Sequence, residues 1–168
     1  MKKILETARL RLREFNLADT AFIIKLLNSP GWIKFIGDRN VRTEEQAIHY
    51  LEKGPLKSYM ENGFGLSMVE LKDNNTPIGM CGILKRDYLD HPDIGFAFLP
   101  EYFGKGYAYE IAGATMNHAK HFWNISKISG ITITDNVSSI QLLEKLGLNF
   151  ARKIYMPDSK EELLLYSN

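Results

Sequence analysis

The hydrophobic residues of this chain recur with two different periods, which predict short strands and amphipathic helices. Leu10 and Leu12 alternate with Arg9, Arg11 and Arg13, as in a strand with one apolar face. Steps of three and four residues elsewhere are typical of helices. These patterns predict further strands over residues 64–71, 78–84, 94–99, 128–134, 148–155 and 162–166, and helices over 22–27, 43–54 with a resumption to 59, 107–122 and 136–147.

The order of these elements is strand, two helices, three strands, helix, strand, helix and two strands. Polar turns over 72–77 and 87–92 join the three strands before residue 100, so we expect these strands to be antiparallel. Residues 32–36 are expected to be a hydrophobic connection between the first two helices. No linker or repeat interrupts the chain, and 168 residues are short for two domains, so residues 1–168 are expected to form one domain of mixed α/β class.

Composition and charge argue against several classes of function. The chain has 21 Lys and Arg against 20 Asp and Glu, and no basic block interleaved with aromatic residues, so a nucleic acid partner is not expected. The apolar stretches are too short to span a membrane and the N-terminal residues have no export signal, so we expect a cytoplasmic protein without a membrane partner. Cys81 is the sole cysteine and lies in an apolar run, where a buried structural role is expected.

The most informative segment joins the strand at 94–99 to the helix that begins at Tyr107. Pro100 lacks a backbone donor and therefore ends the strand. Gly104 and Gly106 lack Cβ atoms, so the backbone can turn its amides inward and let a ligand approach closely. These amides precede a helix N-terminus, where unpaired donors and the helix dipole favour an anion. The segment therefore predicts a pyrophosphate site, with an ordinary strand-to-helix turn as the alternative.

Two common glycine-loop patterns do not fit this segment. A Walker loop needs Ser or Thr after Gly-Lys, whereas Gly106 follows Lys105, and a dinucleotide fingerprint needs Gly or Ala where Tyr109 stands. The run Pro-Glu-Tyr-Phe-Gly-Lys-Gly-Tyr-Ala instead resembles the acyl-CoA loop of the GNAT superfamily of N-acetyltransferases, Gln/Arg-x-x-Gly-x-Gly/Ala, with Gly106 and Ala108 at its small positions. Phe103 departs from the Gln/Arg of this pattern. The segment most resembles the branch that includes the ribosomal-protein N-terminal acetyltransferases, in which an aromatic residue is usual at this position.

A second segment supports the resemblance. The run Asn-Val-Ser-Ser-Ile-Gln-Leu-Leu-Glu-Lys-Leu-Gly over 136–147 is similar to the Asn-x-x-Ala/Ser-x-x-x-Tyr-x-x-x-Gly region of the superfamily, with Leu143 in the tyrosine position. The alternative is that Asn136 is merely a helix cap. The element order is also the GNAT order, so the resemblance extends over almost the whole chain. It implies a mostly antiparallel mixed sheet of about seven strands flanked by about four helices.

The resemblance further implies that acetyl-CoA is the co-substrate and that an amine attacks it directly in a ternary complex. It implies that a backbone amide near Phe98 or Leu99 polarises the thioester carbonyl, where the strand splays from its neighbour. Asn136 would contact the pantetheine or bound water, and Ser139 is the nearest hydroxyl that could protonate the leaving sulfur. Water or an unassisted departure of the thiolate are the alternatives to Ser139. The loop residues implied in pyrophosphate binding are Phe103, Gly104, Lys105, Gly106, Tyr107 and Ala108.

The acceptor side has fewer signals. Asp93 stands where many relatives in this branch carry Glu, which makes it the first candidate for the general base and for acceptor binding; a solvent-facing turn aspartate is the alternative. Trp32 and Phe35 are candidates for one wall of the acceptor pocket, or else for core packing. His118 and His121 lie one helical turn apart without an apparent third ligand, so no metal is expected.

These features together predict an acetyl-CoA-dependent N-acetyltransferase that modifies a primary amine, either a peptide N-terminus or a small molecule. A non-catalytic acyl-CoA-binding module is the alternative, because the tyrosine is missing at Leu143 and the base is uncertain. The sequence leaves open which amine is accepted, and whether the protein forms a homodimer.

Overall fold

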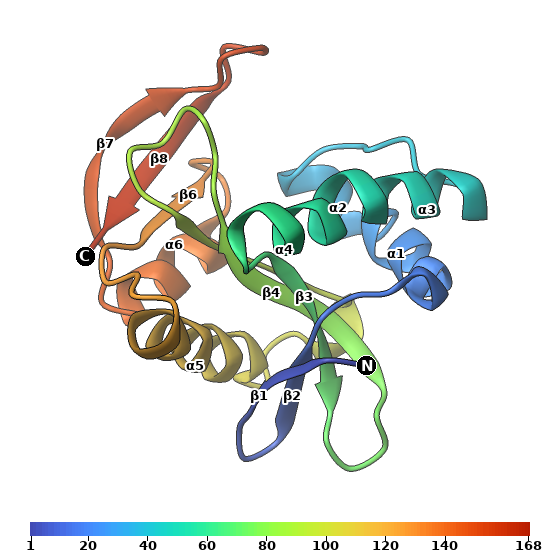
Figure 1. Cartoon of the computed structure of the whole chain (residues 1–168). Coiled ribbons are helices and arrows are strands. Elements are labelled where there is room, and N and C mark those ends of the chain that lie inside the picture. The colour runs from blue at the N-terminus through green and yellow to red at the C-terminus, as the bar shows by residue number, and fades with distance from the viewer.

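One mixed sheet contains strands from both ends of the chain (Figure 1). The computed structural model describes the whole chain, Met1–Asn168. The strands lie in the order β1-β2-β3-β4-β5-β6-β8-β7. All neighbours are antiparallel except β5 and β6, which are parallel. The strands are β1 (Lys3–Glu6), β2 (Leu10–Arg13), β3 (Leu66–Leu71), β4 (Pro77–Leu84), β5 (Asp93–Phe98), β6 (Ser129–Thr132), β7 (Asn149–Tyr155) and β8 (Glu162–Ser167).

Helices cover both faces of this sheet. On one face, α5 and α6 contribute to a core cluster that includes Ile111, Leu143 and the β4 residue Cys81. On the other face, α1 and α3 contribute to a second cluster that includes Leu26 and Met80. The α-helices are α1 (Thr20–Leu27), α2 (Pro30–Phe35), α3 (Glu44–Leu51), α4 (Lys57–Asn62), α5 (Tyr107–Phe122) and α6 (Val137–Lys145). Short 3-10 segments span Leu17–Asp19 and Pro100–Tyr102, and a π-helical segment spans Glu52–Leu56.

A buried ion cluster joins the first helical segment to the sheet. The Arg13 guanidinium on β2 donates to both carboxylate oxygens of Asp19 at 2.9 Å. It also donates through Nε to Glu70 on β3 at 2.7 Å. Asp19 closes a capping box with Asn16, which begins the 3-10 turn before α1. Because all three charged side chains are almost completely buried, their mutual pairing is what makes this position tolerable.

The expected fold class is confirmed, but the counts of elements were too low. The sheet has eight strands instead of about seven, because the four-residue β1 is too short to give a clear alternation. The chain has six α-helices instead of about four. The segment expected to be a connection over 32–36 lies mostly in α2, where Pro30 occupies the first turn, a position at which proline can begin a helix. The helix expected from residue 43 continues through a π-helical segment that accommodates Pro55.

Candidate active site

The two parallel strands β5 and β6 separate after a single residue pair. Asp93 pairs with Ser129, and the Ser129 amide donates to the Pro92 carbonyl at 2.8 Å. No pair follows, although β5 continues for five more residues. The strands therefore form a wedge that opens toward the C-terminal end of β5. Backbone groups on the β6 side of β5 are left without a partner strand along this wedge.

Only one of the two expected backbone donors points into the wedge. The Leu99 amide donates to the Ile78 carbonyl of β4 at 2.9 Å, so Leu99 is not a free donor and that half of the expectation is wrong. Amides of successive strand residues point to opposite sides. The Phe98 amide therefore points toward β6, beyond the last pair between the two strands. Phe98 is the residue that can offer an amide to a ligand carbonyl.

The glycine loop lies immediately after this strand, between the 3-10 turn and α5. Gly104 and Gly106 have φ values of +72° and +79°, a region in which residues with a Cβ are strained. Gly106 is the N-cap of the 16-residue α5. A Cβ on Gly104 would meet no atom within 4 Å, so the backbone there is open to an approaching group. These features fit a pyrophosphate, which needs exposed amides at a helix N-terminus.

Arg9 of the β1–β2 turn supports this loop together with Glu110 in the first turn of α5, and no sequence pattern indicated this role. Arg9 donates through Nη1 to the Lys105 carbonyl at 3.0 Å and through Nε to Glu110 at 2.7 Å. Its guanidinium carbon lies 4.5 Å from the centre of the Tyr107 ring. Arg9 and Glu110 are 101 positions apart, so no local pattern could have related them.

Asp93 lies at the closed end of the wedge, and it is not a solvent-facing turn residue. Its side chain is 1% exposed, and Arg86 Nε donates to Asp93 Oδ1 at 2.9 Å. Arg86 also donates to the Tyr88 hydroxyl at 3.3 Å. Burial raises the pKa of Asp93 above its usual value, and the Arg86 charge only partly opposes this. A carboxylate with a raised pKa is better suited to accept a proton than an exposed aspartate.

The candidate residues near α6 mainly stabilise the N-terminus of that helix or pack in the core. Asn136 Oδ1 accepts a hydrogen bond from the Ser139 amide at 3.2 Å, so the capping role of Asn136 is real. Ser139 is half-buried, and its hydroxyl forms no hydrogen bond within the protein. Leu143 is 1% exposed and packs against β6, where a Cβ on Gly130 would lie 2.5 Å from Leu143 Cδ2. The position that resembles the tyrosine site is therefore filled by core packing.

Comparison with known proteins decides the family. Residues 9–149 match the family of acetyltransferase (GNAT) domains. This chain belongs to that family. Two similar proteins come from Bacillus subtilis (strain 168). YkkB is 27% identical over 159 residues, which cover 91% of this chain and 89% of that protein. The uncharacterized N-acetyltransferase YoaA is 28% identical over 149 residues, which cover 88% and 83%.

Solved structures agree with this GNAT assignment. The GNAT-family acetyltransferase from Bacillus anthracis superposes with a TM-score of 0.80 at 25% identity, covering 98% of this chain and 96% of that one. RimL, a ribosomal L7/L12 α-N-protein acetyltransferase in complex with coenzyme A, superposes with a TM-score of 0.84 at 14% identity. The match covers 99% of this chain and 97% of the RimL chain. At the latter identity the likeness shows the fold alone. The resemblance stated from the sequence is confirmed, and acyl transfer from acetyl-CoA is the activity of this GNAT family.

The two aromatic candidates for the acceptor pocket, Trp32 and Phe35, differ in exposure. Trp32 is 6% exposed and belongs to the second core cluster, while Phe35 is half-buried beneath Lys34. Trp32 Nε1 is a buried side-chain donor without a hydrogen-bond partner. Packing explains most of the Trp32 side chain, but its indole N–H still lacks the partner that a buried donor normally has.

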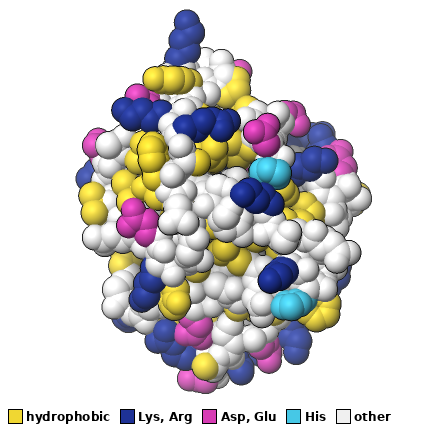
Figure 2. Space-filling model, turned by 90° about the vertical axis from the view of Figure 1, so that its left-hand side faces the viewer, with side chains coloured by type: hydrophobic (Ala, Val, Ile, Leu, Met, Phe, Trp, Pro, Cys, Tyr) yellow, Lys and Arg dark blue, Asp and Glu magenta, His cyan; other side chains and the backbone are white.

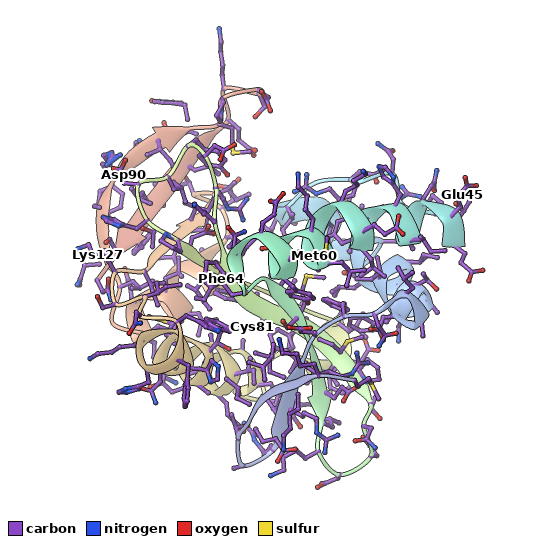
Figure 3. The ribbon with its side chains drawn as sticks, viewed as in Figure 1. Glu45, Met60, Phe64, Cys81, Asp90 and Lys127 are labelled. Carbon is purple, nitrogen blue, oxygen red and sulfur yellow. The ribbon has the colours of Figure 1, made fainter.

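The remaining candidate side chains have structural environments. Cys81 is completely buried among the central strands (Figure 3), and burial raises the pKa of its thiol to about 12. His118 stacks on Phe122 at 4.5 Å between ring centroids and lies edge-on to Trp123. Basic and acidic side chains are interspersed on the side of the molecule shown in Figure 2. No helix is long and apolar enough to cross a membrane.

Proposed function

We propose that this protein is an acetyl-CoA-dependent N-acetyltransferase in which a primary amine attacks the thioester directly, within a ternary complex. The observation that carries the proposal is the wedge between β5 and β6, which has Asp93 at its closed end and the open Phe98 amide along its length. The two-glycine loop follows at the start of α5. Co-substrate and acceptor could therefore meet within one continuous region of the sheet.

Each chemical requirement has a candidate group in this region. Acetyl-CoA, when bound, supplies a thioester whose carbonyl carbon is open to attack. The Phe98 amide stabilises negative charge that builds on the carbonyl oxygen. The loop amides from Phe103 to Ala108 hold the pyrophosphate. Asp93 accepts the proton that the amine loses through waters in the wedge, because it lies five residues, about 16 Å, along β5 from Phe98.

Only a weak candidate proton donor for the leaving sulfur is found on α6. Ser139 is half-buried near the start of that helix and is the candidate to protonate the sulfur, while Asn136 would contact the pantetheine with its free amide nitrogen. Because the side-chain oxygen of Asn136 already caps α6, only the nitrogen is available. Serine is a poor acid, so water is an equally suitable donor for this step.

For the acceptor, we propose a peptide N-terminus ahead of a small-molecule amine. The similarity of the fold to RimL, a ribosomal L7/L12 α-N-protein acetyltransferase, supports this choice, as does the aromatic Phe103 in the loop. Trp32 and Phe35 would line the acceptor side, with the unpaired Trp32 indole N–H as a hydrogen-bond donor.

An acceptor panel tests the proposal. The protein is incubated with acetyl-CoA and with peptides that begin with Ser or Ala, a polyamine, an aminoglycoside and free amino acids, and release of the coenzyme A thiol is followed. Acetylated product from at least one amine, with stoichiometric thiol release, is expected. Coenzyme A binding without thiol release from any acceptor would instead support a non-catalytic acyl-CoA-binding module, which the buried Leu143 favours.

A further inference from the structure

The β1–β2 turn contributes a charged cluster that touches the glycine loop. Glu110 lies in the first turn of α5 and accepts three hydrogen bonds from the turn. Its Oε1 accepts from the Thr7 hydroxyl at 2.6 Å and from the Arg9 amide at 3.0 Å. Its Oε2 accepts from Arg9 Nε at 2.7 Å. The start of α5 is therefore fastened to a segment about a hundred residues earlier in the chain.

The Arg9 guanidinium is fixed in one orientation by partners on several sides. Nε binds Glu110, Nη1 binds the Lys105 carbonyl, and the guanidinium carbon lies 4.5 Å from the Tyr107 ring centre. Nη2 is the one guanidinium nitrogen that forms no hydrogen bond within the protein. It lies 3.4 Å from the position that a Cβ of Gly106 would occupy. A free, oriented donor with a positive charge thus stands directly beside the loop.

The negative charge of Glu110 would repel a phosphate at the start of α5, and the positive charge of Arg9 neutralises it. Burial works against ionisation of Glu110, but hydrogen bonds from Thr7 and Arg9 outweigh it and hold the pKa of Glu110 below its usual value. The side chain is therefore negative at neutral pH. A negative charge in the first turn of α5 stabilises the helix but repels an incoming phosphate. Without Arg9, the carboxylate and the ligand would compete for the same helix N-terminus.

We infer that Arg9 is a positioning and binding residue for the acetyl-CoA pyrophosphate: it holds the Lys105 carbonyl, neutralises Glu110 and offers Nη2 to a phosphate oxygen. This inference rests on the proposed use of the loop as the acetyl-CoA site. It adds to that site a side chain from β1–β2, outside the glycine motif. The guanidinium has three tasks, one for each of its nitrogens, so lysine, which has no planar fork, cannot replace it fully.

The test is a set of four variants, Arg9→Gln, Glu110→Gln, the double variant and Arg9→Lys, titrated with coenzyme A by calorimetry. Loss of one charge-assisted contact predicts about 10- to 100-fold weaker binding for Arg9→Gln, and a smaller loss for Arg9→Lys. The double variant should bind at least about threefold more tightly than Arg9→Gln, because the unpaired carboxylate is gone. Arg11→Gln is the matched control, since Arg11 lies two residues further on, in β2, but pairs with Glu6 and Glu70 instead. It should leave the affinity unchanged.

The Glu110→Gln variant separates binding from folding. It weakens the attachment of the turn to α5 but leaves the Arg9 charge in place, so the inference expects unchanged or tighter binding. If Arg9 and Glu110 serve only to attach the turn to α5, Glu110→Gln must weaken binding about as much as Arg9→Gln, which overturns the inference. The same titrations with 3′-dephospho-coenzyme A should reproduce the loss. A loss confined to intact coenzyme A would move the contact to the 3′-phosphate and overturn the pyrophosphate assignment. A wild-type protein that binds no coenzyme A would refute the proposed function together with this inference, whereas normal binding by Arg9→Gln refutes the inference alone.

Discussion

Replacing Asp93 by Asn removes the proposed base with almost no change in shape. We expect the acetylation rate to fall by about 10² or more, the usual size of a lost general base, while coenzyme A affinity is unchanged because the loop is untouched. The acceptor amine explains the loss. The α-amino group of a peptide, with a pKa of about 7.7–8.0, is mostly protonated at neutral pH, and a lysine-like alkylamine, with a pKa of about 10.4, is almost entirely so. Without Asp93, only the small neutral fraction can react.

The effect of this substitution on stability follows from the raised pKa. A carboxyl whose pKa is higher in the folded than in the unfolded chain stabilises the fold fully below the unfolded pKa, and this contribution is lost as the pH rises through the folded pKa. At neutral pH the ionised Asp93 therefore gives little net stability, and a neutral Asn costs little. Arg86 loses its partner, but its side chain is 30% exposed and keeps contact with water. We expect a loss within about 1 kcal/mol, or roughly 2–4 °C in Tm for a chain of this length.

The assay is a pH–rate profile at saturating acceptor, using the best amine from the panel. In the wild type the rate should fall as the pH drops through the raised pKa of Asp93. The Asp93→Asn deficit should shrink at high pH, where more amine arrives neutral. Arg86→Gln is the companion variant: it removes the charge that lowers the Asp93 pKa, so the acid limb should move to higher pH.

Two results would refute this reasoning. Equal rates for wild type and Asp93→Asn across the range would eliminate Asp93 as the base and leave backbone carbonyls with an ordered water chain as the proton route. A defect of constant size at every pH, together with a large drop in Tm, would show instead that Asp93 only secures the start of β5 through Arg86.

Four further outcomes test neighbouring parts of the site. Gly106→Val should weaken coenzyme A binding at least about tenfold by calorimetry, because φ is +79° there and a side chain would intrude on the loop; unchanged affinity would contradict the assignment of the glycine loop as the pyrophosphate site. Lys105→Ala should change the same affinity less than about threefold, since its backbone does the holding and an exposed charge is screened; a loss as large as that of Gly106→Val would contradict this. Leu143→Tyr should lower Tm without raising the rate, because Leu143 already fills the space at Gly130; a faster enzyme would show that the missing acid can be restored. Cys81 should react with a thiol reagent only when the protein unfolds, and prompt labelling of the native protein would show that its burial is incomplete.

Much of the fold followed from periodicity because the long elements have uninterrupted patterns. The helix expected over 107–122 coincides with α5, and the strand expected over 78–84 lies within β4. The short elements β1 and α2 were not predicted, for a physical reason. β1 has only four residues, and its stability comes from pairing with β2, which no local pattern reveals. The helix α2 begins at a proline that also reads as a stop signal, so its existence depends on packing against α1.

The candidate site was predictable where function depends on backbone conformation, and unpredictable where it depends on contacts between distant segments. Gly104 and Gly106 made the loop predictable, because only residues without a Cβ adopt its positive φ values easily. The choice between Phe98 and Leu99 needed the register of β5 against β4, since a shift of one residue exchanges the two amides. The Arg9–Glu110 pair and the Arg86–Asp93 pair are tertiary contacts, so the sequence could name Asp93 but not its partner.

The wedge and the glycine loop both arise from one feature of the topology, the parallel pairing of β5 with β6. Parallel neighbours need a crossover, so the chain that leaves β5 must pass through α5 before it returns as β6. The N-terminus of that crossover helix necessarily lies at the C-terminal end of β5, which is the end where the two strands have parted. A ligand whose pyrophosphate binds the helix start can therefore lay its remaining length along the open edge of β5, toward Asp93. The single parallel junction in an otherwise antiparallel sheet thus places the proposed phosphate site, the open Phe98 amide and the buried Asp93 carboxylate along one edge of β5.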